Sequence, residues 1–142
     1  MAQYCTFVLD GHLFGIPVAS VQEVLREQEV TPVPLAAPEI SGLINLRGQI
    51  VTTLNLRERL RLPARPQDEP SVSVVVRALD GSAVSLVVDR IGDVLEPDPG
   101  SLESPPETLD PDISALVEGV CKLDGQLMLM LDTERAITVG AS

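Results

Sequence analysis

The 142-residue sequence has few side chains of the kinds that build metal and catalytic sites. It contains one histidine, His12, and two cysteines, Cys5 and Cys121. A structural zinc ion is usually held by about four His or Cys ligands, so this set excludes such a site. Each cysteine lies in an apolar stretch, and the two are far apart along the chain. We therefore expect two buried, reduced thiols rather than a disulfide.

Aromatic residues are almost as scarce, which limits the enzymes that the sequence could form. Tyr4, Phe7 and Phe14 are the only aromatic residues, and there is no tryptophan. Sugar-cleaving sites with paired carboxylates usually offer aromatic platforms, and three aromatics within the first 14 residues cannot line a groove. His12 follows a turn glycine, a common place for a surface histidine. No phosphate-binding glycine loop occurs. We expect no enzyme, catalytic residue, cofactor or metal.

Positive charge and long apolar runs are also lacking. Ten Lys and Arg against 21 Asp and Glu give a net charge of −11. That charge repels polyphosphates, so nucleic acid is excluded as a partner. No run reaches the roughly 18 apolar residues of a membrane span, and the N-terminus has no basic segment followed by an apolar one. We expect a cytoplasmic protein that does not insert into the membrane.

The negative charge is concentrated in the second half of the sequence. Residues 1–71 carry six basic and eight acidic side chains, and residues 72–142 carry four and thirteen. From Asp93 to Glu118 there are eight acidic side chains, five prolines and no basic residue. The spacing does not fit a calcium-binding loop. This pattern predicts a solvated connection that steers basic partners.

The rest of the sequence is typical of short β-strands joined by tight turns. Asp-Gly pairs at 10–11, 80–81 and 124–125 each separate two apolar stretches, which is a strong hairpin signal. Around Arg47 and Gly48, two more stretches predict further strands or one bent strand. The pattern indicates an antiparallel all-β protein whose strands span residues 3–9, 12–16, 42–46, 49–56, 71–79, 82–88, 115–123 and 126–131.

Only three short helices are predicted. After Pro17, the spacing of Val18, Val21, Val24 and Leu25 fits one face of a helix that caps a barrel opening. A second turn or helix is expected within residues 55–62. A third should cover 132–137, with Asp132 as its N-cap.

One long segment is distinctive beyond its composition. The sequence from Thr31 to Arg57, centred on Gly-Leu-Ile-Asn-Leu-Arg-Gly at 42–48, resembles the CheW family of bacterial chemotaxis coupling proteins. The similarity extends from about Gln3 to Ile137. Its other parts are Phe14-Gly15-Ile16, the Val-x-Glu-Val at 21–24, the stretch from Leu86 to Val94, and the stretch from Gly119 to Ile137.

The resemblance implies a fold of two small five-stranded SH3-like β-barrels that share one core. It implies a single domain over 1–142, with approximate subdomains 12–68 and 69–135 and terminal segments that cross between them. It also implies a non-catalytic adaptor, monomeric when free, which couples the cytoplasmic tips of chemoreceptors to the regulatory domain of a CheA-type histidine kinase in arrays at the inner membrane.

Receptor contacts in the family lie in a groove between the barrels. The resemblance therefore implies that the matching positions of this chain line such a groove, and they are named at the end of this paragraph. From the residues alone, Arg47 either contacts the partner or pairs internally with Glu23 or Asp89, and both roles are compatible. Glu23, Asn45 and Asp89 are thus expected orienting or structural groups. Gly42 and Gly48 could be needed only for the backbone conformation, and Val18 and Val21 could belong to the core. The implied groove residues are Val18, Val21, Gly42, Arg47, Gly48 and Val94.

Three departures from the family pattern keep other partners open. Thr52, Asn55 and Ser85 stand where Pro, Asp and Gly are common in the family. A CheW-like adaptor of another kinase pathway, such as twitching motility, would keep the architecture and change the surfaces. A small-molecule-binding β-barrel is an alternative of a different class.

Overall fold

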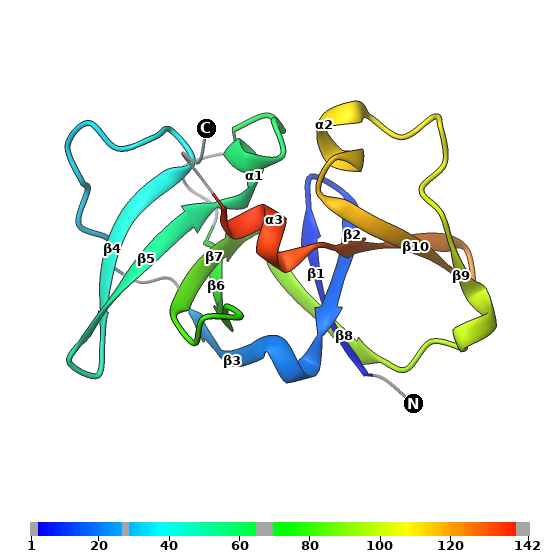
Figure 1. Ribbon diagram of the computed structural model, residues 1–142, viewed down its shortest axis with the longest axis horizontal. Coiled ribbons are helices and arrows are strands. Elements are labelled where there is room, and N and C mark those ends of the chain that lie inside the picture. Colours follow the sequence, from blue (N-terminus) through cyan, green and yellow to red (C-terminus); the bar gives the residue numbers. More distant parts are fainter. Residues whose placement is uncertain (1–2, 27–28, 65–69, 139–142) are drawn as a thin grey trace.

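The computed structural model describes residues 3–26, 29–64 and 70–138, which form two β-sheets and a few short helices (Figure 1). The all-β prediction is confirmed. One sheet contains β3 (Val21–Arg26), β4 (Ile40–Leu46), β5 (Gln49–Asn55), β6 (Val72–Arg77) and β7 (Ala83–Val88). The other contains β1 (Tyr4–Leu9), β2 (His12–Pro17), β8 (Arg90–Leu95), β9 (Leu102–Glu103), β10 (Val117–Leu123) and β11 (Gln126–Leu131). The helices are α1 (Leu56–Arg59), α2 (Pro111–Ser114) and α3 (Thr133–Ile137), and η1 (Val18–Ser20) and η2 (Pro99–Ser101) are 3-10 turns.

The three predicted Asp-Gly hairpins are confirmed, and the structure adds a fourth. β1–β2, β6–β7 and β10–β11 pair antiparallel around the Asp-Gly turns. β4 and β5 also form a hairpin, so the stretches around Arg47 are two strands and not one bent strand. Arg47 and Gly48 have φ values of 52° and 85°. Positive φ at both central residues is the geometry of a type I′ turn, which matches the twist of the flanking strands.

The five-stranded sheet is one continuous segment of chain inserted into the six-stranded sheet. Its strand order is β3-β6-β7-β5-β4, and the other order is β8-β1-β2-β11-β10-β9. The division at residues 68 and 69 therefore does not separate the sheets, because β6 and β7 pair with β3 and β5. β1 and β2 join the six-stranded sheet through a parallel pairing of β2 with β11. Residues 65–69 lie outside the described residues.

The helix predicted after Pro17 is wrong. Residues 18–20 form one 3-10 turn, and residues 21–26 form β3. Along β3 the side chains alternate, with Val21, Glu23 and Leu25 half-buried and Gln22, Val24 and Arg26 exposed. This period of two is that of a strand. β3 forms as a strand because its backbone pairs with β6, which is distant in the sequence. The local spacing of apolar residues gives no sign of this pairing.

The other two predicted helices are confirmed, as is the Asp132 cap, and the structure adds a cap at Asn55. Asn55 Oδ1 accepts hydrogen bonds from the backbone N–H groups of Arg57 and Glu58 at the start of α1, at 3.0 and 3.3 Å. Asp132 Oδ1 accepts one from Arg135 N at the start of α3, at 3.2 Å. Both side chains satisfy donors that have no partner inside the helix.

The acidic segment from Asp93 to Glu118 is more ordered than a solvated connection. It contains the end of β8, η2, β9 and α2, and Asp98 and Asp110 cap the two turns. Most of its side chains are exposed, as expected for so many carboxylates. The sequence did not reveal α2 because a four-residue helix covers barely one helical turn, too short for an apolar repeat to show.

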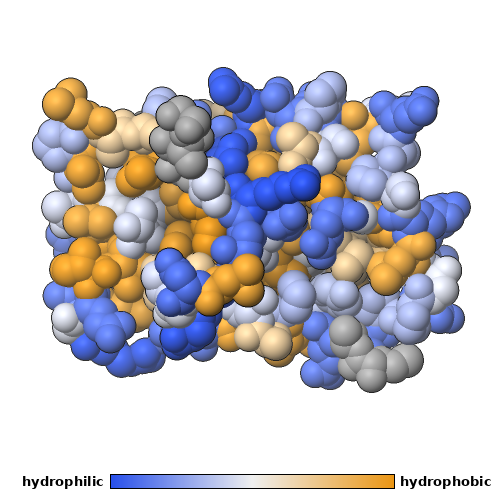
Figure 2. Space-filling view, viewed as in Figure 1, coloured by the Kyte–Doolittle hydropathy of each residue, from blue (hydrophilic) through white to orange (hydrophobic). Residues whose placement is uncertain are grey.

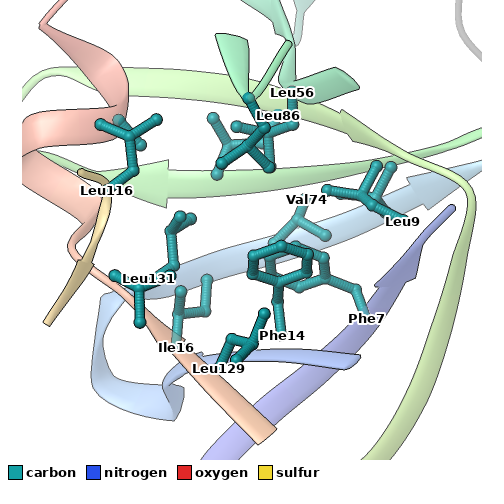
Figure 3. Packing of buried hydrophobic residues seen from close by; sticks show 14 of the residues in the cluster. Phe7, Leu9, Phe14, Ile16, Leu56, Val74, Leu86, Leu116, Leu129 and Leu131 are labelled. Atoms are coloured by element: carbon teal, nitrogen blue, oxygen red, sulfur yellow. The ribbon is translucent and has the colours of Figure 1, made fainter. Parts of the chain in front are cut away.

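One hydrophobic cluster joins the two sheets. It takes Phe7, Phe14 and Ile16 from β1 and β2, and Val74 and Leu86 from β6 and β7 (Figure 3). All five are fully buried. Burying a side chain of this size contributes about 2 kcal/mol. Neither sheet can therefore be removed without exposing part of this shared core.

Each sheet also rolls around a smaller cluster of its own. Ile44 and Leu46 of β4 pack with Leu25 of β3, so the two edges of the five-stranded sheet meet. In the other sheet, Leu95 of β8 packs against a cluster that contains Cys121 of β10. Cys5 and Cys121 are buried free cysteines, as predicted. Within the described residues, no helix has the length and apolar character to cross a membrane.

Candidate functional site

The predicted groove residues Val18, Val21, Gly42, Arg47, Gly48 and Val94 define the candidate surface. Its first part lies on η1 and β3, where the chain passes from the six-stranded to the five-stranded sheet. Val18 N donates a hydrogen bond to Gln3 O at 2.9 Å, and the Val18 residue is 36% exposed. Val21 is half-buried and packs against the shared core. Val18 thus exposes an apolar side chain to solvent, whereas Val21 contributes mainly to the core.

The second part is the turn between β4 and β5, which an ion pair joins to β3. Arg47 Nη1 and Nη2 donate to the two carboxylate oxygens of Glu23 at 2.5 and 2.9 Å. The Arg47 side chain is 73% exposed and that of Glu23 is 17% exposed. The hydrogen bond and the charge of Glu23 raise the pKa of Arg47. Asn45 Oδ1 accepts from Gly48 N at 2.9 Å and supports the turn.

The geometry shows the internal one of the two roles expected for Arg47. The two-pronged pair connects a hairpin tip to the opposite edge of the same sheet. The guanidinium remains exposed to solvent. An exposed pair of this kind contributes little to stability.

The two glycines of the predicted groove have different surroundings. Gly42 is buried with φ of 146°, and a Cβ there would lie 2.2 Å from Thr31 O. Gly48 lies in the β4–β5 turn, where a Cβ would meet nothing within 4 Å. Gly42 is thus required for close packing of the backbone, and Gly48 for the turn conformation.

Val94 lies on the other sheet, near the start of β1. It pairs with Cys5 across β1 and β8 and is 58% exposed. Val18 bonds to Gln3 at the same end of β1, on the side of β2. The structure therefore brings Val18 and Val94 to one end of β1, and brings Glu23, Asn45, Arg47 and Gly48 together at the β4–β5 turn. Gly42 lies elsewhere on β4, where it pairs with Thr53 and packs against the Thr31 backbone.

Asp89 does not pair with Arg47. Its carboxylate binds Arg57 of α1, with Nε to Oδ1 at 2.9 Å and Nη2 to Oδ2 at 2.5 Å. Asp89 N also donates to Val8 O, far along β1 from Gln3. Of the two internal partners left open for Arg47, the structure has Glu23 and not Asp89, because α1, which the sequence alone did not place in space, holds Arg57 beside the end of β7. Sequence reasoning did not single out Arg57.

The described surface exposes several apolar side chains as well as the Arg47 guanidinium. In Figure 2, hydrophobic side chains gather over the five-stranded half, and hydrophilic ones lie over α1 and α3 in the middle. Among the described residues, no group of three or more His, Cys, Asp or Glu side chains could hold a metal ion. Arginine is among the residues enriched at protein contact surfaces. The fold defines a mostly β module built from one five-stranded and one six-stranded sheet.

Comparisons with known proteins identify the family. A family model described as the CheW-like domain matches residues 3–140. The chain belongs to this family, which is a chemotaxis scaffold and adaptor family.

Individual relatives agree over nearly the whole chain. The chemotaxis protein CheW of Treponema pallidum is 28% identical over 136 residues, which cover 94% of this chain and 80% of that protein. The chemotaxis protein CheW of Bacillus subtilis is 29% identical over 131 residues, which cover 92% and 83%. The crystal structure of the scaffolding protein TtCheW from Thermoanaerobacter tengcongensis matches with a TM-score of 0.87 and 29% identity, over 99% of this chain and 95% of that one.

Proposed function

We propose that this protein is a non-catalytic adaptor that couples the cytoplasmic tips of chemoreceptors to the regulatory domain of a CheA-type histidine kinase. Membership of the CheW-like family supports the adaptor role. The observation that carries the receptor contact is the exposed Arg47 guanidinium, held by Glu23 at the edge of a surface that also exposes Val18 and Val94. A monomer in the cytoplasm, recruited to receptor arrays, fits this role.

The receptor contact can be tested at Arg47 without disturbing the turn. Because Arg47 has φ of 52° and precedes Gly48, Arg47→Asn creates the Asn-Gly pair that type I′ turns prefer. We expect this variant to weaken binding to a purified receptor cytoplasmic fragment by about 30-fold, or about 2 kcal/mol, as for a contact hot spot. Surface plasmon resonance measures the affinity, and thermal unfolding should show an unchanged or slightly higher Tm.

Two controls make this result specific. Arg90→Ala removes an exposed arginine from β8, outside the candidate surface, and should leave receptor binding unchanged. Binding to an isolated CheA-type regulatory domain should also persist in Arg47→Asn if the kinase uses other faces. Wild-type protein that binds neither fragment at micromolar concentration contradicts the adaptor proposal.

Two alternatives predict different results. An adaptor of another kinase pathway, suggested by Thr52, Asn55 and Ser85, would bind a different CheA-like kinase and fail with the chemotaxis kinase. A ligand-binding barrel would need an interior cavity, but clusters of apolar side chains pack inside both sheets. We therefore propose the chemotaxis adaptor.

A further inference from the structure

The helix α1 bonds to groups on both sides of the boundary between the two sheets. It begins directly after β5, so it is part of the five-stranded half. Its two arginines, Arg57 and Arg59, are two residues apart and have separate partners. Each arginine reaches a group in or next to the six-stranded half.

Arg57 makes the first connection, to the chain segment that links the two sheets. It donates two hydrogen bonds to Asp89, between β7 and β8, and a third to Pro63 O at 2.7 Å. Asp89 Oδ2 also accepts from Asp10 N, in the β1–β2 turn, at 2.9 Å. The Arg57 and Asp89 side chains are 10% and 16% exposed. One nearly buried pair thus connects α1 to the turn of the six-stranded sheet.

Arg59 makes the second connection, to the helix that follows β11. Its Nε donates to Ala136 O at 3.0 Å, and its Nη2 donates to Arg135 O and Thr138 O at 2.8 and 3.3 Å. These carbonyls lie at the end of α3, where most backbone acceptors have no partner within the helix, although Arg135 O also accepts from Thr138 N at 3.3 Å. Cations are favourable at this end of a helix. In Figure 1, α3 lies across the middle of the molecule beside α1.

A further contact ties α3 to the five-stranded half. Glu134 Oε2, in the first turn of α3, accepts from Leu79 N in the β6–β7 loop at 3.0 Å. α3 is therefore held at both of its ends by groups of the half that it does not follow in sequence. An open groove of about 560 Å³ lies between α1, α2 and α3, beside the apolar cluster to which Leu60 and Ala136 belong, so polar contacts add to apolar packing on this side.

These contacts are better suited to fixing an orientation than to adding stability. A nearly buried ion pair gains little net free energy over apolar side chains of similar size, because both charges lose their hydration. Its geometry is nevertheless restrictive, because the flat guanidinium fits two acceptors in one plane. Apolar contacts in the shared core are not directional, so they restrict orientation less than these hydrogen bonds do.

We propose that α1 is an orientation clasp, in which Arg57 and Arg59 set the angle between the two sheets. The clasp would thereby fix how Arg47 on one half is placed relative to Val94 on the other. This consequence for binding rests on the proposed function, but the clasp itself does not.

The angle can be measured directly with a pair of spin labels. Gln49 on β5 and Gln126 on β11 are exposed, one on each half. Both would be changed to cysteine in a background that carries Cys5→Ala and Cys121→Ala, and the distance distribution measured by pulsed electron spin resonance. We expect Arg59→Met, and Arg57→Met combined with Asp89→Asn, each to broaden this distribution about twofold, because more orientations become populated. The combined triple variant should broaden it further.

Matched controls separate orientation from stability. Met130→Ala creates a cavity inside the six-stranded half, far from α1, and should lower the Tm without broadening the distribution. Arg61→Asn removes a neighbouring exposed cation, and Asn tolerates the φ of 60° at this position. It should change neither quantity.

Two outcomes would overturn the clasp. One is an unchanged distance distribution in a clasp variant with a lowered Tm, which would make the contacts local stabilisers only. The other is equal broadening in Met130→Ala. Because the measurement needs no partner, it stands even if the protein binds no receptor fragment. If it does bind one, clasp variants should lose affinity several-fold while Arg61→Asn keeps it.

Discussion

At the scale of single residues, Gly42 and Gly48 show why one motif can serve two purposes. Both lie in the stretch that most strongly resembles the family, and both have positive φ. Gly42 lies against the Thr31 backbone, whereas Gly48 faces open space. Positive φ alone costs a side chain about 1–2 kcal/mol. A clash with backbone atoms adds to that cost because the backbone cannot rotate away.

Alanine at the two positions should therefore have unequal effects. Gly42→Ala should lower the free energy of unfolding by about 2–4 kcal/mol, as expected for strain together with overpacking. Gly48→Ala should lower it by about 1 kcal/mol. Urea denaturation of both variants measures the difference. Equal losses would contradict the structural role assigned to Gly42, and any loss of receptor binding in Gly42→Ala should follow its loss of stability.

Glu118 provides a pH-dependent prediction at the same scale. The pKa of the Glu118 carboxyl is raised, chiefly by burial and then by repulsion from Asp132, while the charge of Arg135 acts in the opposite direction. A carboxyl with a raised folded-state pKa binds protons more tightly when folded, so stability falls as the pH rises through the interval between its unfolded and folded pKa values. Above that interval, the charged group opposes folding.

Glu118→Gln should therefore raise the Tm slightly at pH 7. The difference from the wild type should disappear when the pH is lowered below the carboxyl range, where Glu118 is protonated. Thermal unfolding at pH 7 and pH 3.5 makes the comparison. A lower Tm in the variant at pH 7 would mean that the attraction of Arg135 outweighs burial and Asp132.

At the scale of secondary-structure elements, local signals in the sequence decided the hairpins but not β3. An Asp-Gly pair fixes its turn through neighbouring residues only, so the turns at residues 10, 80 and 124 could be predicted. The apolar spacing from Val18 to Leu25 fits both a helix and a strand. Its outcome depends on β6, which pairs with β3 from about 50 residues away.

The same distinction explains the candidate site. Glu23 was one of two internal partners expected for Arg47, and the structure shows this pair. Asp89 was the other, and it instead binds Arg57 because α1 turns back toward the end of β7. The local sequence does not indicate the direction that the chain takes at α1. Arg57 and Arg59 were therefore not predicted to connect the two sheets.

The cap of α1 gives a prediction at this scale. Asn55 accepts two backbone hydrogen bonds at the start of the helix that carries both clasp arginines. Asn55→Ala should lower the free energy of unfolding by about 1 kcal/mol, the usual cost of losing an N-cap. Asn55→Asp should be neutral or slightly stabilising, because a carboxylate also caps and favours a helix N-terminus. Chemical denaturation of both variants tests this, and equal destabilisation would contradict the capping role.

At the scale of the whole molecule, the shared core should make the two sheets unfold together. Leu86 and Phe14 lie in one cluster although they belong to different sheets. Tyr4, the only tyrosine in a chain without tryptophan, packs in the six-stranded half. Its fluorescence therefore reports on that half, while far-ultraviolet circular dichroism reports on both.

The two signals should give one coincident unfolding transition. Leu86→Ala, in the five-stranded sheet, should shift both by the same amount and lower the free energy of unfolding by about 2–5 kcal/mol. A Tyr4 transition that stays in place while the dichroism signal shifts would show that the halves unfold independently.

The insertion of one sheet within the other also fixes an order of events during synthesis on the ribosome. The β1–β2 hairpin emerges first with its apolar residues, but its parallel partner β11 begins only at Gln126. The complete inserted segment from Val21 to Val88 can leave the ribosome earlier and pair its own strands. Contacts between such distant parts of a chain form slowly and leave apolar strands exposed meanwhile. Nascent chains of this protein should therefore depend on chaperones until β11 has been made, and a stalled chain that ends before residue 126 should be a better chaperone substrate than the finished protein.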